Sequence, residues 1–187
     1  MKNKKTNGWQ EFELGKIMKL RGGFAFKSEK FSEKGIPIIR ISNFNNNDVD
    51  LSDSVFCPNT EANNYNEFLL KENDILIAMS GATTGKIGVV KKEILPCLLN
   101  QRVGKFEILD DNLYWKYLLF FVKSSEFLKE ILSMAGGCAQ PNISGKQIES
   151  IKIILPSLPV QKKIVAILEK AESLKQKREE ADKKTNE

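Results

Sequence analysis

The stretch PSLPVQKKIVAILEKAESLKQKREEADKKTNE, residues 156–187, carries a heptad pattern. Its seam positions alternate in spacing between four and three residues, and all but one are apolar: Val160, Ile164, Ile167, Ala171, Leu174, Arg178 and Ala181. This spacing is typical of a coiled coil. Because no glycine or proline follows Pro159, the pattern predicts one uninterrupted helix about 40 Å long.

Most of the positions between the seam residues are charged, so the seam is a narrow apolar stripe on a polar helix. A stripe of this width buries too little area to stabilise an isolated helix in water. Two arrangements stay open, in which the helix packs back on its own domain or pairs with a helix of another chain or repeat. Its polarity rises toward the C-terminus, which favours pairing. We therefore expect a homodimer through this helix.

The length of 187 residues predicts one compact domain over residues 1–155, followed by the helix over 156–187. Hydrophobic residues make up 41% of the chain, which is enough for an ordinary core. No apolar run approaches the roughly 20 residues that a membrane span needs. The basic start, MKNKK, is not followed by the apolar segment of a secretory signal. These features lead us to expect a cytoplasmic protein without a membrane anchor.

The sequence contains no histidine, which excludes Ser–His and Cys–His catalysis and histidine-based metal sites. Its three cysteines, Cys57, Cys97 and Cys138, are 40 and 41 residues apart and form no C-x-x-C pair. Their odd number and wide spacing argue against a disulfide framework and against a zinc site. We expect no metal and no cofactor.

The segment GATTGKI, residues 81–87, is similar to a phosphate-binding loop but departs from it. A Walker A motif has about four residues between its glycines, and this segment has three. Ile87 follows the lysine and has no hydroxyl group for Mg²⁺, and a strand-like run follows where a nucleotide site requires a helix. Methyltransferase-type tetrads and a nuclease-type E-x-K triplet are also absent. The chain is therefore expected to bind rather than to catalyse.

Strand-like segments dominate the middle of the chain and helix-like segments follow them, which predicts an α+β domain. We expect strands over residues 35–41, 74–79, 87–91, 97–106 and 151–155, and helices near 60–67, through 115–122 and over 125–134. Residues 8–20 are expected to form a short helix or turn. Asp110 or Asp111 is expected to cap the helix through 115–122.

Five polar loops flank the apolar strands and carry side chains suited to nucleic acid. Asn and Gln can pair with adenine, Arg and Lys with guanine, and Ser, Thr, Lys and glycine amides with phosphates. The candidate DNA-binding residues are Lys27, Ser28, Arg40, Asn43, Ser80, Gly81, Thr83, Thr84, Lys86, Asn100, Gln101, Arg102, Gln140 and Asn142. The net charge of +5 permits a nucleic-acid partner. The alternative for each loop is a solvated turn in which Asn and Thr bond the backbone.

Within this set, base contacts are expected from Gln101 and Arg102, which are predicted to lie in a rigid strand. Thr83, Thr84 and Lys86 are expected to contact phosphates or bases, because the glycines beside them allow close approach of the backbone. The alternative is that Asn100 and Gln101 brace the sheet.

Several stretches, in this order, make the sequence similar to the specificity subunits of type I restriction-modification systems. They are GFAFKS (23–28), GIPIIRI (35–41), DILIAMSG (74–81), GKIG (85–88), NQRV (100–103) and LPSLPVQ (155–161) with IV at 164–165. The resemblance implies a target recognition domain that binds one half of a split double-stranded DNA site, followed by a helical spacer. It also implies partners: DNA adenine methyltransferase subunits that dock on the spacer, and restriction subunits that join through the complex. Catalysis would belong to those partners.

Members of this family usually carry two recognition domains and two spacers, whereas this sequence contains one of each. Two arrangements stay open: a half-length subunit that pairs with itself on a palindromic split site, or a piece of a longer chain. A different function also stays open, that of a coiled-coil adaptor whose globular head binds protein or carbohydrate.

Overall fold

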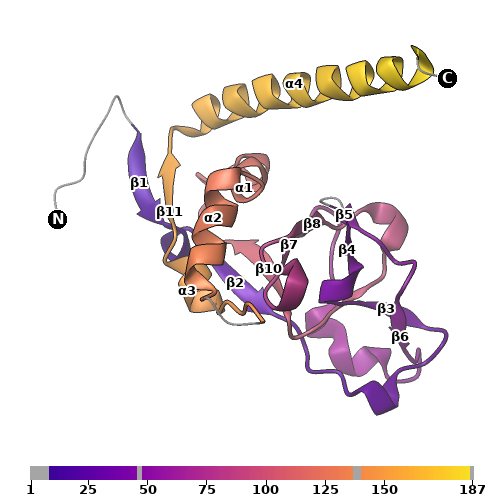
Figure 1. Cartoon of the computed structure of the whole chain (residues 1–187). Coiled ribbons are helices and arrows are strands. Elements are labelled where there is room, and N and C mark those ends of the chain that lie inside the picture. Colours follow the sequence, from indigo (N-terminus) through magenta and orange to yellow (C-terminus); the bar gives the residue numbers. More distant parts are fainter. Residues whose placement is uncertain (1–8, 46–47, 137–139, 186–187) are drawn as a thin grey trace.

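A four-stranded antiparallel sheet forms the centre of the protein (Figure 1). Along the sheet the strands are β2 (Met18–Gly22), β10 (Val103–Ile108), β7 (Ile75–Ala78) and β8 (Ile87–Val89). The structure is a computed structural model, and it describes residues 9–45, 48–136 and 140–185. Every neighbouring pair in this sheet is antiparallel. β7 and β8 follow one another in the sequence, whereas β2 and its partner β10 lie far apart in it.

The two faces of this sheet differ because side chains alternate along each strand. One face packs against three helices, α1 (Trp115–Val122), α2 (Ser125–Met134) and α3 (Gly145–Glu149). The other face is apolar at its β7–β8 end, where it contributes Leu76, Ala78, Val90 and Val103 to a second core cluster. At its β2–β10 end the same face carries ion pairs, Arg21–Glu107 and Lys105–Asp74, each at 3.4 Å. The sheet is therefore the shared wall between two cores.

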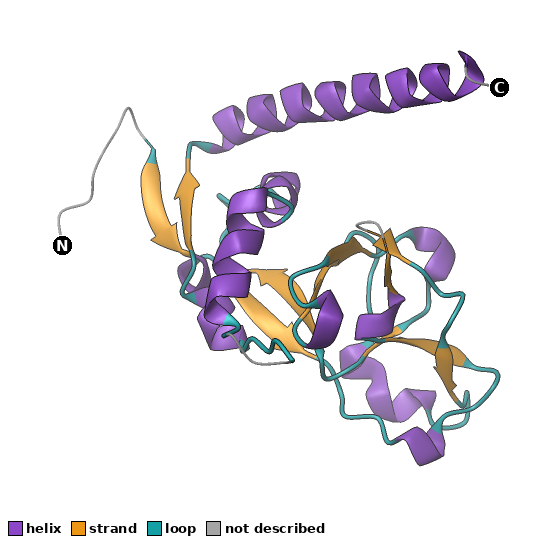
Figure 2. Ribbon diagram, in the orientation of Figure 1, coloured by secondary structure: helices purple, strands orange, loops and turns teal. Residues whose placement is uncertain are grey.

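A second lobe adjoins the apolar end of that face (Figures 1 and 2). It contains a three-stranded sheet in the order β6 (Val55–Cys57), β3 (Ile36–Ile39) and β9 (Leu98–Leu99), and a small ribbon of β4 (Phe44–Asn45) and β5 (Asp48–Val49). Four aromatic rings pack in this lobe with centroids 4.8–5.4 Å apart: Phe24, Phe26, Tyr65 and Phe68. Tyr65 and Phe68 come from the 3₁₀ helix Ala62–Phe68.

Gly23 is the point where the chain crosses from β2 into the second lobe. A Cβ atom at this position would lie 2.1 Å from the carbonyl oxygen of Leu99 and 2.5 Å from that of Asn100. The crossing is held by two backbone hydrogen bonds, from Phe24 N to Leu99 O and from Gln101 N to Phe24 O, both 2.9 Å long. Only a residue without a side chain permits this approach.

The long helix α4 (Leu158–Thr185) leaves a two-stranded ribbon of β1 (Gln10–Glu13) and β11 (Lys152–Leu155) and extends beyond the α1–α3 helices (Figure 1). Gln161 anchors its first turn and is fully buried, with 0% of its surface exposed. Its side-chain oxygen accepts a hydrogen bond from Tyr114 N, and its amide nitrogen donates to Asn112 O and Pro156 O, each at 2.8 Å. Tyr114 is the N-cap of α1, so one side chain joins the starts of α1 and α4.

Two separate stripes run along α4. The stripe that faces the body begins with Leu158, Gln161, Val165 and Leu168, of which Gln161 and Val165 are buried. The predicted heptad seam lies about 130° around the helix from this stripe, at roughly 100° per residue. Its members Ile167 and Leu174 are 69% and 59% exposed. Val160 and Ile164, at the start of the seam, are half-buried, so the seam is turned away from the body of its own chain only from Ile167 onward.

The α+β class and the long C-terminal helix predicted from the sequence are confirmed. The elements over 75–78, 87–89, 115–122, 125–134 and 152–155 also match the expected types. Pairing of α4 with another helix stays a prediction. The basic start at residues 1–5 and Cys138 lie outside the described residues.

Three local expectations were wrong. Residues 9–20 are mostly strand, because β1 pairs with β11 and β2 pairs with β10, and these partners come from far along the chain; only the 3₁₀ helix Leu14–Lys16 between the two strands matches the expected short helix or turn. The strand expected over 97–106 is broken: β9 ends at Leu99, a turn follows, and β10 begins at Val103. Neither Asp110 nor Asp111 is the N-cap of α1; the Asp110 carboxylate instead accepts hydrogen bonds from Asn112 at 2.8 and 2.9 Å.

Replacing Gly23 with alanine is expected to destabilise the protein by about 3 kcal/mol or more, since the methyl group would overlap backbone atoms that cannot move aside. Gly22→Ala is the matched control, because a Cβ there meets nothing within 4 Å. Urea unfolding followed by circular dichroism measures both. Equal midpoints for the two variants would show that the crossing is not tightly packed.

Gln161→Ala is expected to lower the free energy of unfolding by about 2–4 kcal/mol, because it leaves three backbone groups without their partners inside the protein. Gln176→Ala makes the same change farther along α4, where the side chain is exposed, and is expected to shift stability by less than about 0.5 kcal/mol. Chemical unfolding of both variants provides the comparison. A small effect at position 161 would contradict its role as the anchor of α4.

Candidate nucleic-acid interface

Three of the predicted polar loops meet in one place, at the adjacent ends of β7 and β10. Residues 79–84 are bonded to the 140–143 segment by two backbone hydrogen bonds, from Gly81 N to Pro141 O and from Ile143 N to Met79 O, each 2.9 Å long. Ser80 and Asn142 are also partners in an isolated β-bridge. We call residues 80–86, 100–102 and 140–142 the loop junction.

The turn at Arg102 joins the same junction from the other side. Met79 N donates a hydrogen bond to Arg102 O at 3.0 Å, and the Arg102 guanidinium donates a long one, 3.5 Å, to the Ser80 hydroxyl. Val103 N donates to Asn100 O at 3.0 Å and closes the turn. Gln101 and Arg102 thus project from a tight turn rather than from a strand, and the turn is fixed at both ends.

The junction sorts the candidate residues by exposure. Within the junction, five candidates have exposed side chains: Lys86, Gln101, Arg102, Gln140 and Asn142. Gly81, Thr83 and Asn100 are half-buried. The exposed set supplies two cationic groups and three amides, which are donors and acceptors suited to phosphates and base edges.

Ser80 and Thr84 are buried, with 5% and 6% of their surfaces exposed, so the expectation that their side chains contact DNA is corrected. The Thr84 hydroxyl lies 2.7 Å from Gly81 O and 3.1 Å from Pro141 O. Both side chains are used inside the junction. Gly81 has a φ of +74°, a left-handed conformation that glycine adopts without strain.

The expectation that Asn43 contacts DNA is also corrected, because this residue is 1% exposed and its side chain makes three hydrogen bonds within the protein. Its oxygen accepts from Arg40 N at 2.9 Å, and its nitrogen donates to Asp50 O at 2.9 Å and to the Ser54 hydroxyl at 3.3 Å. Asn43 therefore shapes the 40–54 loop. At this position the alternative reading of the loop is correct, since Asn43 bonds the backbone of its own loop.

Arg40 lies beside the loop junction and is half-buried. Its guanidinium donates to Asp53 O at 2.9 Å and lies 3.9 Å from the Asp53 carboxylate. Its neighbour Ile41 would lie 3.4 Å from a Cβ built on Gly81, so the two turns touch. Lys27 and Ser28 are exposed in the second lobe, and their segment connects to the junction through the bond from Gln101 N to Phe24 O.

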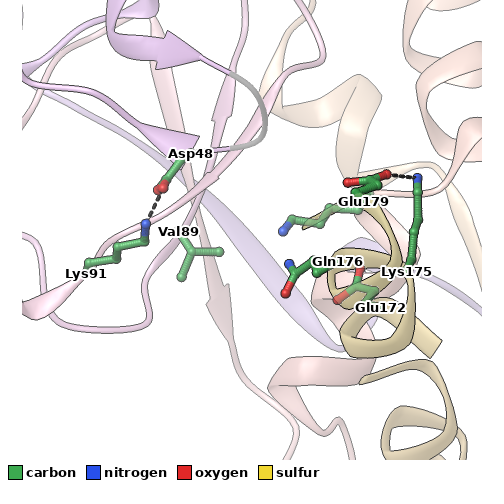
Figure 3. Close-up of a pocket in the computed structure, with 8 residues that line it drawn as sticks. Asp48, Val89, Lys91, Glu172, Lys175, Gln176 and Glu179 are labelled. Carbon is green, nitrogen blue, oxygen red and sulfur yellow. Dashed lines mark hydrogen bonds and ion pairs between the residues drawn. The ribbon is translucent and has the colours of Figure 1, made fainter. Parts of the chain in front are cut away.

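A different cleft, of about 410 Å³, separates the distal half of α4 from the body (Figure 3). Its described lining residues are Glu172, Lys175, Gln176 and Glu179 on α4 and Asp48, Val89, Lys91 and Lys123 on the body, and none of the candidate DNA-binding residues is among them. Lys91 pairs with Asp48, and Lys175 lies 3.8 Å from Glu179. The charges in this cleft therefore balance one another locally.

The two described cysteines are buried and free. Burial raises the pKa of the Cys97 thiol to about 12 and also raises the pKa of Cys57. Both are therefore protonated and weakly nucleophilic at neutral pH. Within residues 9–45, 48–136 and 140–185, no three potential ligand side chains gather as a metal site, and no helix is long and apolar enough to cross a membrane.

Comparison with known proteins matches the chain to one family. The family model described as "Type I restriction modification DNA specificity domain" covers residues 6–183. The chain is 34% identical over 155 residues to the EcoAI specificity subunit of Escherichia coli, across 81% of this chain and 26% of that protein. It is 30% identical over 169 residues to the MjaVIII specificity subunit of Methanocaldococcus jannaschii, across 89% of this chain and 40% of that protein.

Solved structures share the fold. The HsdS subunit from Thermoanaerobacter tengcongensis superposes with a TM-score of 0.68 at 21% identity, covering 90% of this chain and 38% of that one. A chain from a structure of type I R-M complex assembly and conformational transition gives a TM-score of 0.73 at 21% identity, covering 96% and 42%. The chain thus spans less than half the length of the proteins it resembles.

Proposed function

The chain belongs to the type I restriction modification DNA specificity family, and from this premise we propose that it binds one half of a split double-stranded DNA site. Residues 1–155 are the target recognition domain in this proposal, and residues 156–187 are the helical spacer. The adaptor function considered from the sequence has no support among the relatives.

The loop junction carries this proposal. Sequence readout requires side chains that reach base edges from a rigid support. The junction presents Gln101, Arg102, Gln140 and Asn142 from backbone segments that are bonded to one another. Arginine suits guanine, and glutamine suits adenine. Lys86, on the 80–86 loop of the junction, suits a phosphate. Lys27, Ser28 and Arg40 then extend the contact surface into the second lobe.

The α4 seam supports the proposed assembly. The stripe that faces the body packs on its own domain at Gln161 and Val165, whereas the seam at Ile167 and Leu174 is exposed and apolar. A second helix can pack there without displacing the body. We propose that this helix comes from a second copy, that DNA adenine methyltransferase subunits dock on the paired spacers, and that restriction subunits join through them in the cytoplasm. The chain itself supplies recognition and no catalysis.

Arg102→Ala is expected to relax sequence discrimination at one base position by roughly 5- to 150-fold, the equivalent of about 1–3 kcal/mol for a good bidentate contact. Lys86→Ala is expected to weaken all sequences alike and to flatten the slope of log affinity against log salt by about one unit, because one phosphate contact is lost. Methylation of a randomised target library by complexes with the methyltransferase subunit measures the first effect, and salt titration of binding measures the second.

Circular dichroism of both variants is the control that the fold is intact. An unchanged sequence preference in a folded Arg102→Ala complex would place the reading surface elsewhere. A binding affinity of the wild-type complex that does not depend on salt would contradict DNA binding itself.

The wild-type chain is expected to be a dimer in solution, and Ile167→Asp with Leu174→Asp is expected to dissociate it, because two carboxylates per helix would enter the apolar seam. Ala166→Asp with Ser173→Asp adds the same charge at exposed positions off the seam and is expected to leave the dimer intact. Light scattering at micromolar concentration decides the question. A monomeric wild-type chain would refute pairing between copies.

A further inference from the structure

The Thr84 hydroxyl occupies a special place in the loop junction. It lies 2.7 Å from Gly81 O in its own turn and 3.1 Å from Pro141 O, which is 57 residues away. A hydroxyl group has one proton to donate. The Thr84 proton therefore alternates between the two carbonyl groups or is shared by them, and it links the 81–84 turn to the 140–142 segment.

The 140–142 segment depends on this link more than an ordinary strand would. Proline has no backbone N–H group, so Pro141 can bond to the turn only through its carbonyl oxygen. That oxygen accepts from Gly81 N at 2.9 Å and faces the Thr84 hydroxyl. The next attachment, Ile143 N to Met79 O, lies beyond Asn142. The Thr84 hydroxyl is thus one of three described groups, with Gly81 N and Met79 O, that bond the backbone on either side of Asn142 and so fix its position relative to the turn.

Asn142 is coupled to Arg102 through Ser80. Ser80 pairs with Asn142 in the β-bridge, and its hydroxyl accepts the hydrogen bond from the Arg102 guanidinium at 3.5 Å. Ser80 is buried while Arg102 and Asn142 are exposed. The two exposed residues are therefore connected through one buried residue.

We propose that Thr84 is a positioning residue for DNA recognition, which holds Pro141 so that Asn142 and Arg102 read neighbouring bases as one unit. This proposal rests on the proposed function and adds a role for a residue that does not touch DNA. Arginine suits guanine and asparagine suits adenine, so these are the bases that the two side chains are best suited to read.

Two variants of Thr84 separate its hydroxyl from its shape. Thr84→Val keeps the volume and removes the proton donor, whereas Thr84→Ser keeps the donor and removes a methyl group. In complex with the methyltransferase subunit, Thr84→Val is expected to lose discrimination by roughly 3- to 30-fold, below the full loss of a bidentate contact. The loss is expected at the same base position that Asn142→Ala affects. Thr84→Ser is expected to discriminate as the wild type does.

Hydrogen exchange on the chain without DNA gives a second readout. The amide groups of Gly81 and Ile143 are expected to exchange faster in Thr84→Val than in Thr84→Ser, since the segment they bond is held less firmly. Equal exchange rates together with wild-type discrimination in Thr84→Val would overturn the positioning role. If the positioning role of Thr84 fails in this way but Arg102→Ala still alters sequence discrimination, the proposed DNA-recognition function stands.

A double-mutant cycle tests the shared reading unit without any change at Thr84. The effects of Arg102→Ala and Asn142→Ala on discrimination are expected to be non-additive, because the two side chains share one support. Additive effects would overturn the proposal. A wild-type complex with no sequence preference would overturn the proposed function together with this inference.

Discussion

The backbone contact between Gly23–Phe24 and Leu99–Gln101 is the constraint on which the other parts of the protein depend. It brings the end of β2 against the segment between β9 and β10 closely enough to exclude any side chain at Gly23. This crossing brings the end of β2 in the central sheet directly against β9 in the second lobe. The central sheet is then covered by one core on the face that packs against the helices and by the second core at the β7–β8 end of its other face.

The same contact determines where the loop junction lies. Gln101 N donates to Phe24 O, and Arg102 O accepts from Met79 N, so the turn between them is fixed by two different segments. Rigid loops cost less conformational entropy on binding than mobile ones. The buried side chains of Ser80 and Thr84 extend this rigidity to residues 140–142. The polar side chains of Ser80 and Thr84 thus support the surface from inside, while Arg102 and Asn142 are exposed on it.

Helix α4 carries two different stripes, one that packs against the body and one whose apolar residues Ile167 and Leu174 are exposed. Gln161 and Val165 attach it to the body, and the ion pair between Lys116 and Glu169 at 2.5 Å extends the attachment by another turn. Beyond Leu168 the stripe that faces the body becomes charged and the cleft opens. The seam on the other side of the helix stays apolar over the same turns, at Ala171 and Leu174. A helix built in this way is attached to the body of the chain along one stripe and presents the exposed apolar residues Ile167 and Leu174 along the other.

Local patterns in the sequence determined the long helix, the α+β class, several buried strands and the order of motifs that indicates the family. These features depend on periodicity and composition, which are properties of neighbouring residues. Tertiary structure alone decided that residues 10–13 and 18–22 are strands, since their partners lie at 152–155 and 103–108. It also decided that Asn43, Ser80 and Thr84 are internal supports while Arg102 and Asn142 are exposed. A polar side chain in a loop looks the same in the sequence whether it bonds its own backbone or faces solvent, and only the carbonyl groups that the fold brings beside it settle which it does.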